Sequence, residues 1–252
     1  MPLIRTLVAS AALVASACAA AGPVASYDFN NSFASTVAGA PVLTATDPLG
    51  LSGFGVDTVF GSSLNVYNFK GTSANTEQAG LTLNTTGLLT SNSVYTVELV
   101  FKFTERQNAW RRIVDVQNRT SDNGFYVDPS NNLNVFPIGG GSPFTNDVYH
   151  DVFLTDDNGV VKFYLDGSAQ ATLNTTVMNI DSNNLVNLFL DNVVGGGQNE
   201  YSSGSIARFQ LYNEALGSGD IAPPVPEPQT YALLMAGLGV VAAVARRRKS
   251  AR

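Results

Sequence analysis

The segment from Val94 to Phe103 constrains the fold of this chain more than any other stretch. Large apolar side chains alternate in it with Thr96, Glu98 and Lys102, so in an extended strand the apolar groups all fall on one face. Burial of each such side chain contributes roughly 1.5–3 kcal/mol, and we therefore predict a strand that packs on a hydrophobic core. The apolar face consists of Tyr95, Val97, Leu99, Phe101 and Phe103.

Short extended runs of the same kind recur between residues 22 and 220, separated by turn sequences. Gly, Asn, Ser and Thr are abundant there, and no stretch outside the two termini has a convincing helical period. About 200 residues suffice for one domain with a substantial core, and this strand spacing is typical of a β-sandwich or barrel. We expect strands at 24–29, 63–67, 80–83, 94–103, 111–117, 125–127, 133–136, 149–155, 160–165, 168–173, 185–190 and 205–212.

Turn chemistry predicts several connections between these strands. Asp156-Asp157-Asn158-Gly159 is a strong tight-turn sequence, and residues 128–132 read as a second hairpin. Two glycine-containing segments, 47–55 and 139–141, predict loops. The second lacks the GK[ST] sequence and the following helix of a phosphate-binding loop.

The C-terminal segment, residues 221–252, has three parts in a fixed order. Residues 223–228 form a proline-rich, stiff spacer, and residues 231–245 carry no charge and predict a short transmembrane helix. A basic cluster follows and would stay cytoplasmic. It consists of Arg246, Arg247, Arg248 and Lys249.

This arrangement resembles the PEP-CTERM sorting signal of exported bacterial proteins, with Val225, Pro226, Glu227 and Pro228 as the motif. The resemblance implies a precursor anchored in the inner membrane and an exosortase as partner, which cuts near the motif. The product is then released or attached at the cell surface. A plain C-terminal membrane anchor is the alternative, and it leaves the Pro-Glu-Pro element unexplained.

The first 21 residues are typical of a secretory signal peptide. Arg5 precedes an apolar run at residues 7–14, and small residues follow up to Gly22. Cys18, the only cysteine, lies inside this segment. A lipoprotein role for Cys18 is disfavoured because Ala15 stands where a larger aliphatic residue is usual. The mature protein therefore has no disulfide and no thiol chemistry.

The net charge of the exported part excludes some classes of binding partner. Six of the 14 Lys and Arg residues lie in the two terminal segments, which leaves eight against 20 acidic residues and a net charge of about −12 for the exported part. Such a surface repels nucleic acid and anionic lipid, and it suits an extracellular protein that binds cations.

A second resemblance covers nearly the whole body. Tyr27-Asp28-Phe29, residues 150–155, residues 163–167 and residues 204–216 look like successive signatures of laminin G-like, concanavalin A-like domains. The resemblance implies an all-β jelly-roll sandwich of two antiparallel sheets for residues 22–220. The sequence departs from the family at Gly217-Ser218-Gly219, where a short helical turn is usual.

The sequence predicts no catalytic site. Retaining glycosidases of this fold usually place two carboxylates on one strand face, about 5–5.5 Å apart. The pattern Glu-x-Asp-x-x-Glu, which would do so, is absent. Glu98 and Glu105 would lie on opposite strand faces, and we interpret them as solvated surface acids. His150 is the only histidine and has no nucleophile motif nearby, so we interpret it as structural.

Two further candidates concern ligand binding. Asp191, Asn192 and Glu200, around Gly195-Gly196-Gly197, could converge on Ca²⁺, which wants 6–8 oxygen ligands. The laminin G-like resemblance also implies calcium at the rim of the sandwich. A polar loop with Asp191 capping a turn is the alternative. Trp110 is a candidate stacking platform for a sugar ring, although an aromatic residue at a strand edge is the simpler interpretation.

We therefore expect a non-catalytic, exported recognition or matrix module at the cell surface that binds extracellular polysaccharide or another ligand. A glycoside hydrolase or lyase of the same fold is the alternative, as is a purely structural biofilm or cell-surface protein. An acidic pair facing each other across a concave sheet would favour the enzyme. An open groove with exposed aromatic side chains would favour the lectin.

Processing provides the first test. The protein isolated from its native surface should begin between residues 20 and 23 and end near the Pro-Glu-Pro motif. Intact-mass measurement checks both ends. A surface-exposed form that still contains Arg248 would contradict sorting and leave a simple anchor.

Overall fold

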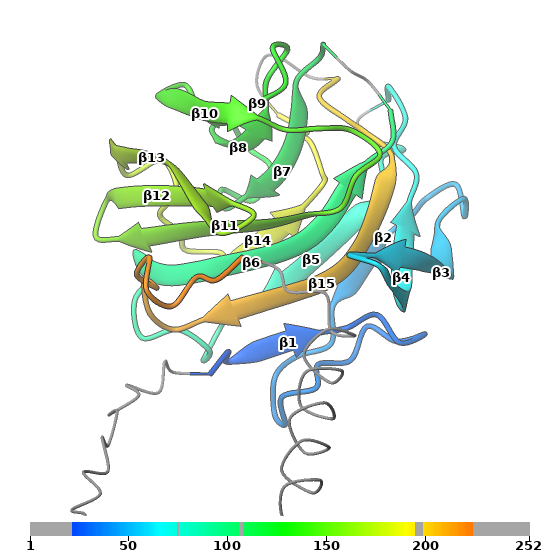
Figure 1. Ribbon diagram of the computed structural model, residues 1–252, viewed down its shortest axis with the longest axis horizontal. Coiled ribbons are helices and arrows are strands. Elements are labelled where there is room, and N and C mark those ends of the chain that lie inside the picture. The colour runs from blue at the N-terminus through cyan, green and yellow to red at the C-terminus, as the bar shows by residue number, and fades with distance from the viewer. Residues whose placement is uncertain (1–21, 75, 106–107, 195–198, 224–252) are drawn as a thin grey trace, which may run out of the picture.

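The computed structural model describes residues 22–74, 76–105, 108–194 and 199–223, and the regular structure in these ranges consists of β-strands (Figure 1). None of the described residues forms a helix long and apolar enough to cross a membrane. The predicted signal peptide, the sorting motif at 225–228, the apolar segment and the basic cluster at 246–249 lie outside the described residues.

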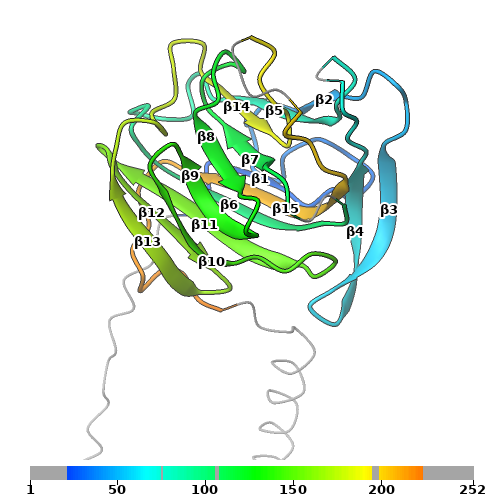
Figure 2. The same cartoon turned by 90° about the horizontal axis from the view of Figure 1, so that it is seen from above.

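Two antiparallel sheets pack face to face, as expected for a β-sandwich (Figures 1 and 2). The first contains, in spatial order, β13 (Ser168–Asn174), β12 (Val160–Leu165), β11 (His150–Asp157), β6 (Val94–Phe103), β15 (Gly204–Tyr212), β4 (Ser62–Phe69) and β3 (Gly53–Val59), and β1 (Ala25–Tyr27) also pairs with β15. The second contains β10 (Gly139–Pro143), β9 (Asn132–Phe136), β8 (Gly124–Val127), β7 (Arg111–Asp115), β14 (Leu185–Leu188), β5 (Gly80–Asn84) and β2 (Thr44–Thr46).

Strand β6 lies in the middle of the first sheet and is buried on both faces. Its predicted apolar face enters the core between the sheets, where Leu99 and Phe101 are at most 1% exposed. Val100 and Glu98 point to the other face, yet they are only 2% and 3% exposed. The outer face of this sheet is therefore covered in part, which the alternating pattern alone does not predict.

Aromatic rings fill one end of the core. Phe69 and Phe189 stack with ring centroids 4.0 Å apart, and Phe101 lies 5.3 Å from both Phe189 and Phe144. Such ring pairs add about 0.5–1.5 kcal/mol each beyond the area they bury. The rings tie β4, β6 and the segment after β14 into one packed unit.

Three hairpins of the first sheet turn through two residues that both have positive φ, the type I′ geometry that suits the strand twist. Asn158-Gly159 has φ values of 52° and 86°, which confirms the predicted turn, and Asp166-Gly167 has 51° and 78°. The third, Phe60-Gly61, has 48° and 85°. An aromatic residue is an outlier at such a position, which usually holds Asn, Asp or Gly.

Two segments for which the sequence predicts loops are strands in part. Strand β3 begins at Gly53, inside residues 47–55, and residues 139–141 belong to β10. The short strand β2 is a further element that the sequence does not indicate. All three are edge strands with few alternating side chains, so hydrophobic periodicity does not reveal them. At Gly141 a Cβ would come within 2.8 Å of the Phe163 ring, so glycine there permits close packing.

The chain after β15 folds back over the outer face of the first sheet. Leu216 and Ile221 pack against Phe153 and Tyr164, and the Leu216 amide donates to the Thr96 hydroxyl at 2.9 Å. The fold therefore includes Ile221, one residue past the expected boundary at 220. Pro223 lies against the Asp166-Gly167 turn. The contact is so close that a Cβ added at Gly167 would lie only 2.6 Å from the Pro223 nitrogen.

Replacing Phe101 by Ala should lower the free energy of unfolding by about 3–5 kcal/mol, because it opens a cavity among packed rings. For a domain of this size the melting temperature should fall by roughly 6–20 °C. Val56→Ala is the control, since Val56 is 68% exposed on β3, and it should change stability by less than about 0.5 kcal/mol. Similar melting temperatures for the two variants would contradict this description of the core.

Candidate functional site

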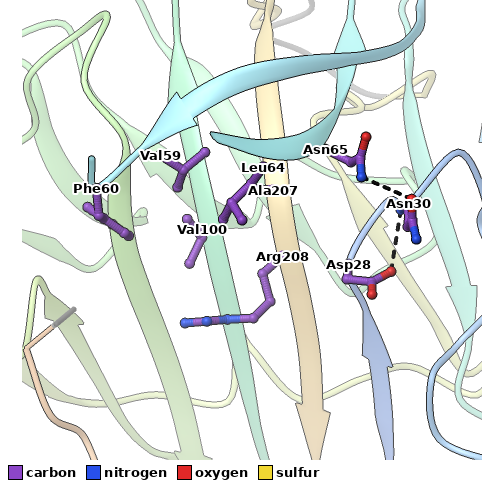
Figure 3. A pocket seen from close by; sticks show the side chains of 9 residues that line it. All are labelled: Asp28, Asn30, Val59, Phe60, Leu64, Asn65, Val100, Ala207 and Arg208. Atoms are coloured by element: carbon purple, nitrogen blue, oxygen red, sulfur yellow. Dashed lines mark hydrogen bonds between the residues drawn. The ribbon is translucent and has the colours of Figure 1, made fainter. Parts of the chain in front are cut away.

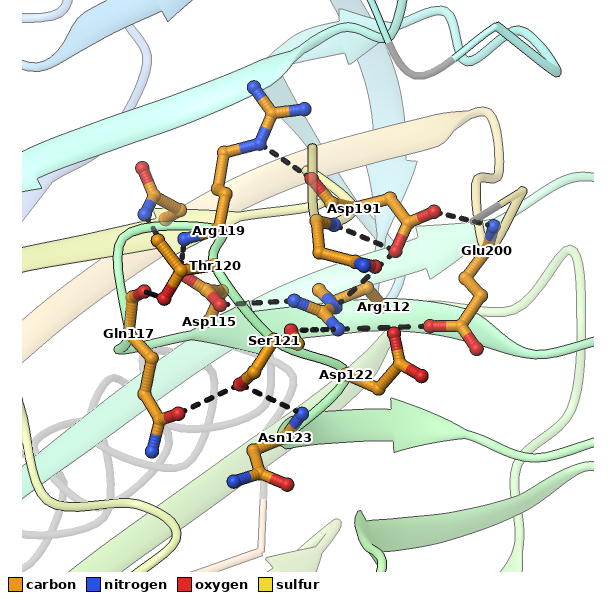
Figure 4. A network of polar contacts seen from close by, with 12 residues as sticks. Arg112, Asp115, Gln117, Arg119, Thr120, Ser121, Asp122, Asn123, Asp191 and Glu200 are labelled. Atoms are coloured by element: carbon orange, nitrogen blue, oxygen red, sulfur yellow. Dashed lines mark hydrogen bonds and ion pairs between the residues drawn. The ribbon is translucent and has the colours of Figure 1, made fainter. Parts of the chain in front are cut away.

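The acidic residues predicted to hold calcium meet a guanidinium group (Figure 4). Arg112 on β7 places its Nε 3.8 Å from Asp191 Oδ1 and its Nη2 3.8 Å from Glu200 Oε2. Its Nη1 lies 3.0 Å from Asp115 Oδ2, and the guanidinium lies over the Tyr126 ring at 4.7 Å. Arg112, Asp115 and Asp191 have fully buried side chains. We call these residues the Arg112 network.

The oxygens of Asp191 are already used inside the protein. Oδ1 accepts from the Asn192 amide at 2.8 Å, and Oδ2 accepts from the amides of Asn199 and Glu200 at 2.8 and 2.9 Å. The Asn192 side chain donates to the Val194 carbonyl at 3.1 Å. The described residues contain no group of three or more His, Cys, Asp or Glu side chains placed to hold a metal ion. As arranged here, the three residues do not fit Ca²⁺, and calcium binding stays a prediction.

Arginines offset part of the acidic charge in the Arg112 network. Arg119 lies beside the network and, with Arg112, accompanies the two buried aspartates. The Arg119 amide donates to Asp115 Oδ1 at 2.9 Å, and its Nε donates to the Asp191 carbonyl at 2.6 Å. Burial and the neighbouring Asp191 carboxylate raise the pKa of Glu200 to about 8, and Arg112 offsets only part of that effect. Glu200 is therefore mostly protonated at neutral pH, which removes one negative charge from the network.

A pocket of about 250 Å³ lies elsewhere, on the outer face of the first sheet (Figure 3). The β3–β4 hairpin curls over this face, so Val59 packs with Val100 of β6 and Ala207 of β15. We call this cavity the hairpin pocket. Its apolar lining comes from Val59, Phe60, Leu64, Val100 and Ala207, and its polar lining from Asp28, Asn30, Asn65 and Arg208.

A β-bulge in β15 builds the floor of the hairpin pocket. The register with β6 shifts between Ile206, opposite Phe101, and Arg208, opposite Val100. Ile206 points into the core, and the extra residue leaves Ala207 and Arg208 both facing outward. Bulges of this kind re-aim side chains and are common beside functional sites.

Phe60 forms one wall of the hairpin pocket from the strained position at the tip of the hairpin. Holding a non-glycine residue at positive φ costs of order 1–3 kcal/mol, and such strain clusters at binding sites. The opposite wall is polar: Asn65 Nδ2 donates to Asn30 Oδ1 at 2.9 Å, beside the exposed Asp28 carboxylate (Figure 3). The pocket thus has an aromatic side, an aliphatic floor and a hydrogen-bonding side.

Arg208 is held from below by two carboxylates. Its Nη2 lies 2.5 Å from Glu98 Oε1 and 3.2 Å from Asp151 Oδ2, and the Tyr212 hydroxyl donates to Glu98 Oε2 at 2.9 Å. Burial and the neighbouring Glu98 raise the pKa of Asp151 to about 7. The expectation that Glu98 is a solvated surface acid is therefore wrong. Arg208, Tyr212 and the chain after β15 cover the outer face around it.

The other residues considered from sequence have structural roles. His150 Nδ1 lies 2.7 Å from Asp166 Oδ2, and its ring packs on Phe144 at 4.6 Å. Trp110 is half-buried, with its ring 5.3 Å from Phe136 and at a steep angle to it. Glu105 is half-buried and forms an ion pair with Lys70.

Sequence reasoning missed the hairpin pocket because its residues come from five separate strands or strand ends. Asp28 and Arg208 do lie within segments that carry the laminin G-like resemblance, but nothing in their spacing shows that they converge. The one local signal is Phe60-Gly61. An aromatic residue directly before a turn glycine indicates a strained hairpin tip, but only once β3 and β4 are known to pair.

Comparisons with known proteins agree with this fold. A family model described as the concanavalin A-like lectin/glucanases superfamily matches residues 75–222, and a PEP-CTERM protein-sorting motif matches residues 224–249. The search of curated proteins gave no match.

Two solved structures illustrate the likeness. Domain 4 of AbnA, an extracellular arabinanase from Geobacillus stearothermophilus in complex with arabinotriose, is 18% identical with a TM-score of 0.59, over 79% of this chain and 96% of that one. A chain of botulinum neurotoxin type C, whose cell entry depends on two ganglioside molecules, is 14% identical with a TM-score of 0.52, over 79% of this chain and 50% of that one. At these identities the likeness shows the fold alone.

The pKa of Glu200 predicts how stability depends on pH. Because the folded state holds this proton more tightly than the unfolded chain, stability should fall as pH rises from about 4.5 to about 8. Glu200→Gln, which mimics the protonated acid, should remove this part of the fall. A tenfold change in acidity is worth about 1.4 kcal/mol, so the loss of melting temperature between pH 5 and 8 should shrink by at least about 3 °C.

The matched control is Glu77→Gln, at an exposed carboxylate for which the described residues provide no ion pair. The Glu77→Gln variant should show the same dependence of melting temperature on pH as wild type, because Asp151 and Glu200 contribute to it unchanged. Parallel profiles for Glu200→Gln and wild type would contradict the buried, protonated state of Glu200.

Proposed function

The chain belongs to the concanavalin A-like lectin/glucanases superfamily, and we propose that its body is a recognition module that binds one sugar ring of an extracellular polysaccharide in the hairpin pocket. The PEP-CTERM motif implies an exported protein that is anchored in the membrane before processing by an exosortase. A glycan at or outside the cell surface is the ligand that such a location offers.

The observation that carries this proposal is the two-sided chemistry of the hairpin pocket. A sugar ring presents an apolar face of C–H groups and an edge of hydroxyls. The Phe60 ring and the floor of Val100 and Ala207 suit the first, and the Asn30–Asn65 pair suits the second. Rigid aromatic side chains give contact area at little cost in conformational entropy, and a few placed polar groups give orientation.

The size of the hairpin pocket also limits the ligand. At about 250 Å³, it is smaller than the roughly 300–1,000 Å³ of sites for drug-sized molecules. A single ring, at a chain end or in a branch, fits this volume. The arabinotriose and the gangliosides named for the two structural relatives support sugars as a ligand class, and no more than that.

A glycoside hydrolase is the second candidate, because Glu98 and Asp151 both contact one nitrogen of Arg208. With its pKa raised to about 7, Asp151 could donate a proton at neutral pH. We prefer the binding module, since Arg208 engages both carboxylates and each side chain is only 4% exposed. A substrate would have to displace that arginine.

Phe60→Asn tests the proposal with little risk to the fold. Asn-Gly is the favoured type I′ turn sequence, so this variant should melt at the same or a higher temperature than wild type. Loss of the ring should weaken binding of the best ligand from a glycan array by about tenfold or more. Undiminished binding would place the ligand elsewhere. Release of reducing ends that stops in Glu98→Gln would establish the hydrolase instead.

A further inference from the structure

The positive groups near the hairpin pocket are already neutralised. Arg208 contacts both Glu98 and Asp151. Lys102, which neighbours this region on β6, lies 2.7 Å from Asp57 Oδ2 and over the Tyr149 ring. Both cations are therefore already paired with acidic side chains and attract an anionic ligand only weakly.

Asp28 is in the opposite situation. It is exposed at the polar wall of the hairpin pocket, and within the described residues its carboxylate accepts one long bond of 3.4 Å, from the Asn30 amide, and forms no ion pair. With Glu98, Asp151 and Arg208, the charged side chains in and under the pocket sum to about −2 at neutral pH when all are ionised, and still to −1 when Asp151 is protonated. A cationic ligand gains from this field, and an anionic one is repelled.

From this charge distribution we propose that the hairpin pocket selects an amino sugar, a ring that bears a free ammonium group. This inference rests on the proposed function and names its ligand class. The ammonium group lies against the Asp28 carboxylate and forms an ion pair with it, whereas an N-acetylated ring offers only a neutral amide N–H. Uronic and sialic acids, which carry a carboxylate, are excluded by the same field.

The rest of the polar wall is compatible with such a ring. Because Asn65 donates to Asn30, the remaining oxygen of Asn65 and the remaining amide group of Asn30 can serve hydroxyls of the ligand as acceptor and donor. Phe60 lies on the opposite side of the pocket from this wall, where its ring suits the apolar face of the sugar (Figure 3). A basic peptide would use the same charge, but the paired amides have no role in binding a lysine side chain.

The experiment compares three oligosaccharides of equal length, made of glucosamine, N-acetylglucosamine and galacturonic acid, by calorimetry in slightly acidic buffer. The probe set also includes trilysine, and the protein is the full-length chain in detergent. The glucosamine trimer should bind about tenfold tighter than its N-acetylated counterpart, and the galacturonate trimer should not bind. The preference should shrink as salt is added.

Asp28→Asn should bring the affinity for the glucosamine trimer down to that for the N-acetylated one and leave the latter unchanged. Asp157→Asn is the matched control, since Asp157 pairs with Val94, six residues along β6 from Val100. It removes the same charge far from the pocket and should change neither affinity.

The outcomes separate this inference from the proposed function. Equal affinities for the two uncarboxylated trimers, or tightest binding of galacturonate, would overturn the amino-sugar preference and leave a sugar-binding module. Absence of binding to all three trimers would likewise overturn the amino-sugar preference, and the glycan array then decides on the sugar-binding module. Binding of trilysine through Asp28, with no sugar bound here or on the array, would overturn both.

Discussion

The burial of β6 on both of its faces is the constraint on which the rest of the structure depends. On the inner side its apolar residues form the middle of the core between the sheets. On the outer side Val100 supports the floor of the hairpin pocket, while Glu98 and Thr96 hold Arg208 and the chain after β15. One strand therefore sets both the stability of the sandwich and the shape of its outer surface. A polar group on that outer side can be buried only because a partner reaches it.

Both buried charge clusters use an arginine between two or more acids, and they do different things. The Arg112 network joins β7 to the segment after β14 and to Glu200, far from the hairpin pocket. Buried ion pairs of this kind add little net stability, but loss of one partner is costly because the other charge is stranded. The Arg208 cluster instead lies at the surface of the pocket, where the arginine side chain remains 43% exposed. The first arrangement ties β7 to Asp191 and Glu200, and the second holds the Arg208 side chain at the hairpin pocket.

Much of the fold could be predicted from local pattern. Strands with strong alternation, such as β6 and β12, and turns such as Asn158-Gly159 are specified by a few adjacent residues. The edge strands β3 and β10 could not be predicted in this way. Their pairing depends on backbone hydrogen bonds and on glycines that let neighbouring side chains come close to the backbone. At the site, Asp191 and Glu200 lie together through the Glu200 amide, whereas their predicted role in calcium binding stays a prediction. Their partner, Arg112, lies about 80 residues earlier and is brought to them by the pairing of β7 with β14. The bulge at Ala207 depends on register with β6, which no local pattern encodes.

The contact of Pro223 with the Asp166-Gly167 turn has a consequence for how the molecule stands on a membrane. The match to the sorting motif begins at residue 224, directly after Pro223, so almost no linker separates the folded body from the motif. Pro226 is the third residue after Pro223, and three fully extended residue steps span at most about 11 Å. An enzyme that cuts there must work close to the β12–β13 edge of the sheet. Strand β3 forms the opposite edge of the same sheet. In the precursor the attachment point of the folded body is therefore at the edge of the sheet opposite the β3–β4 hairpin.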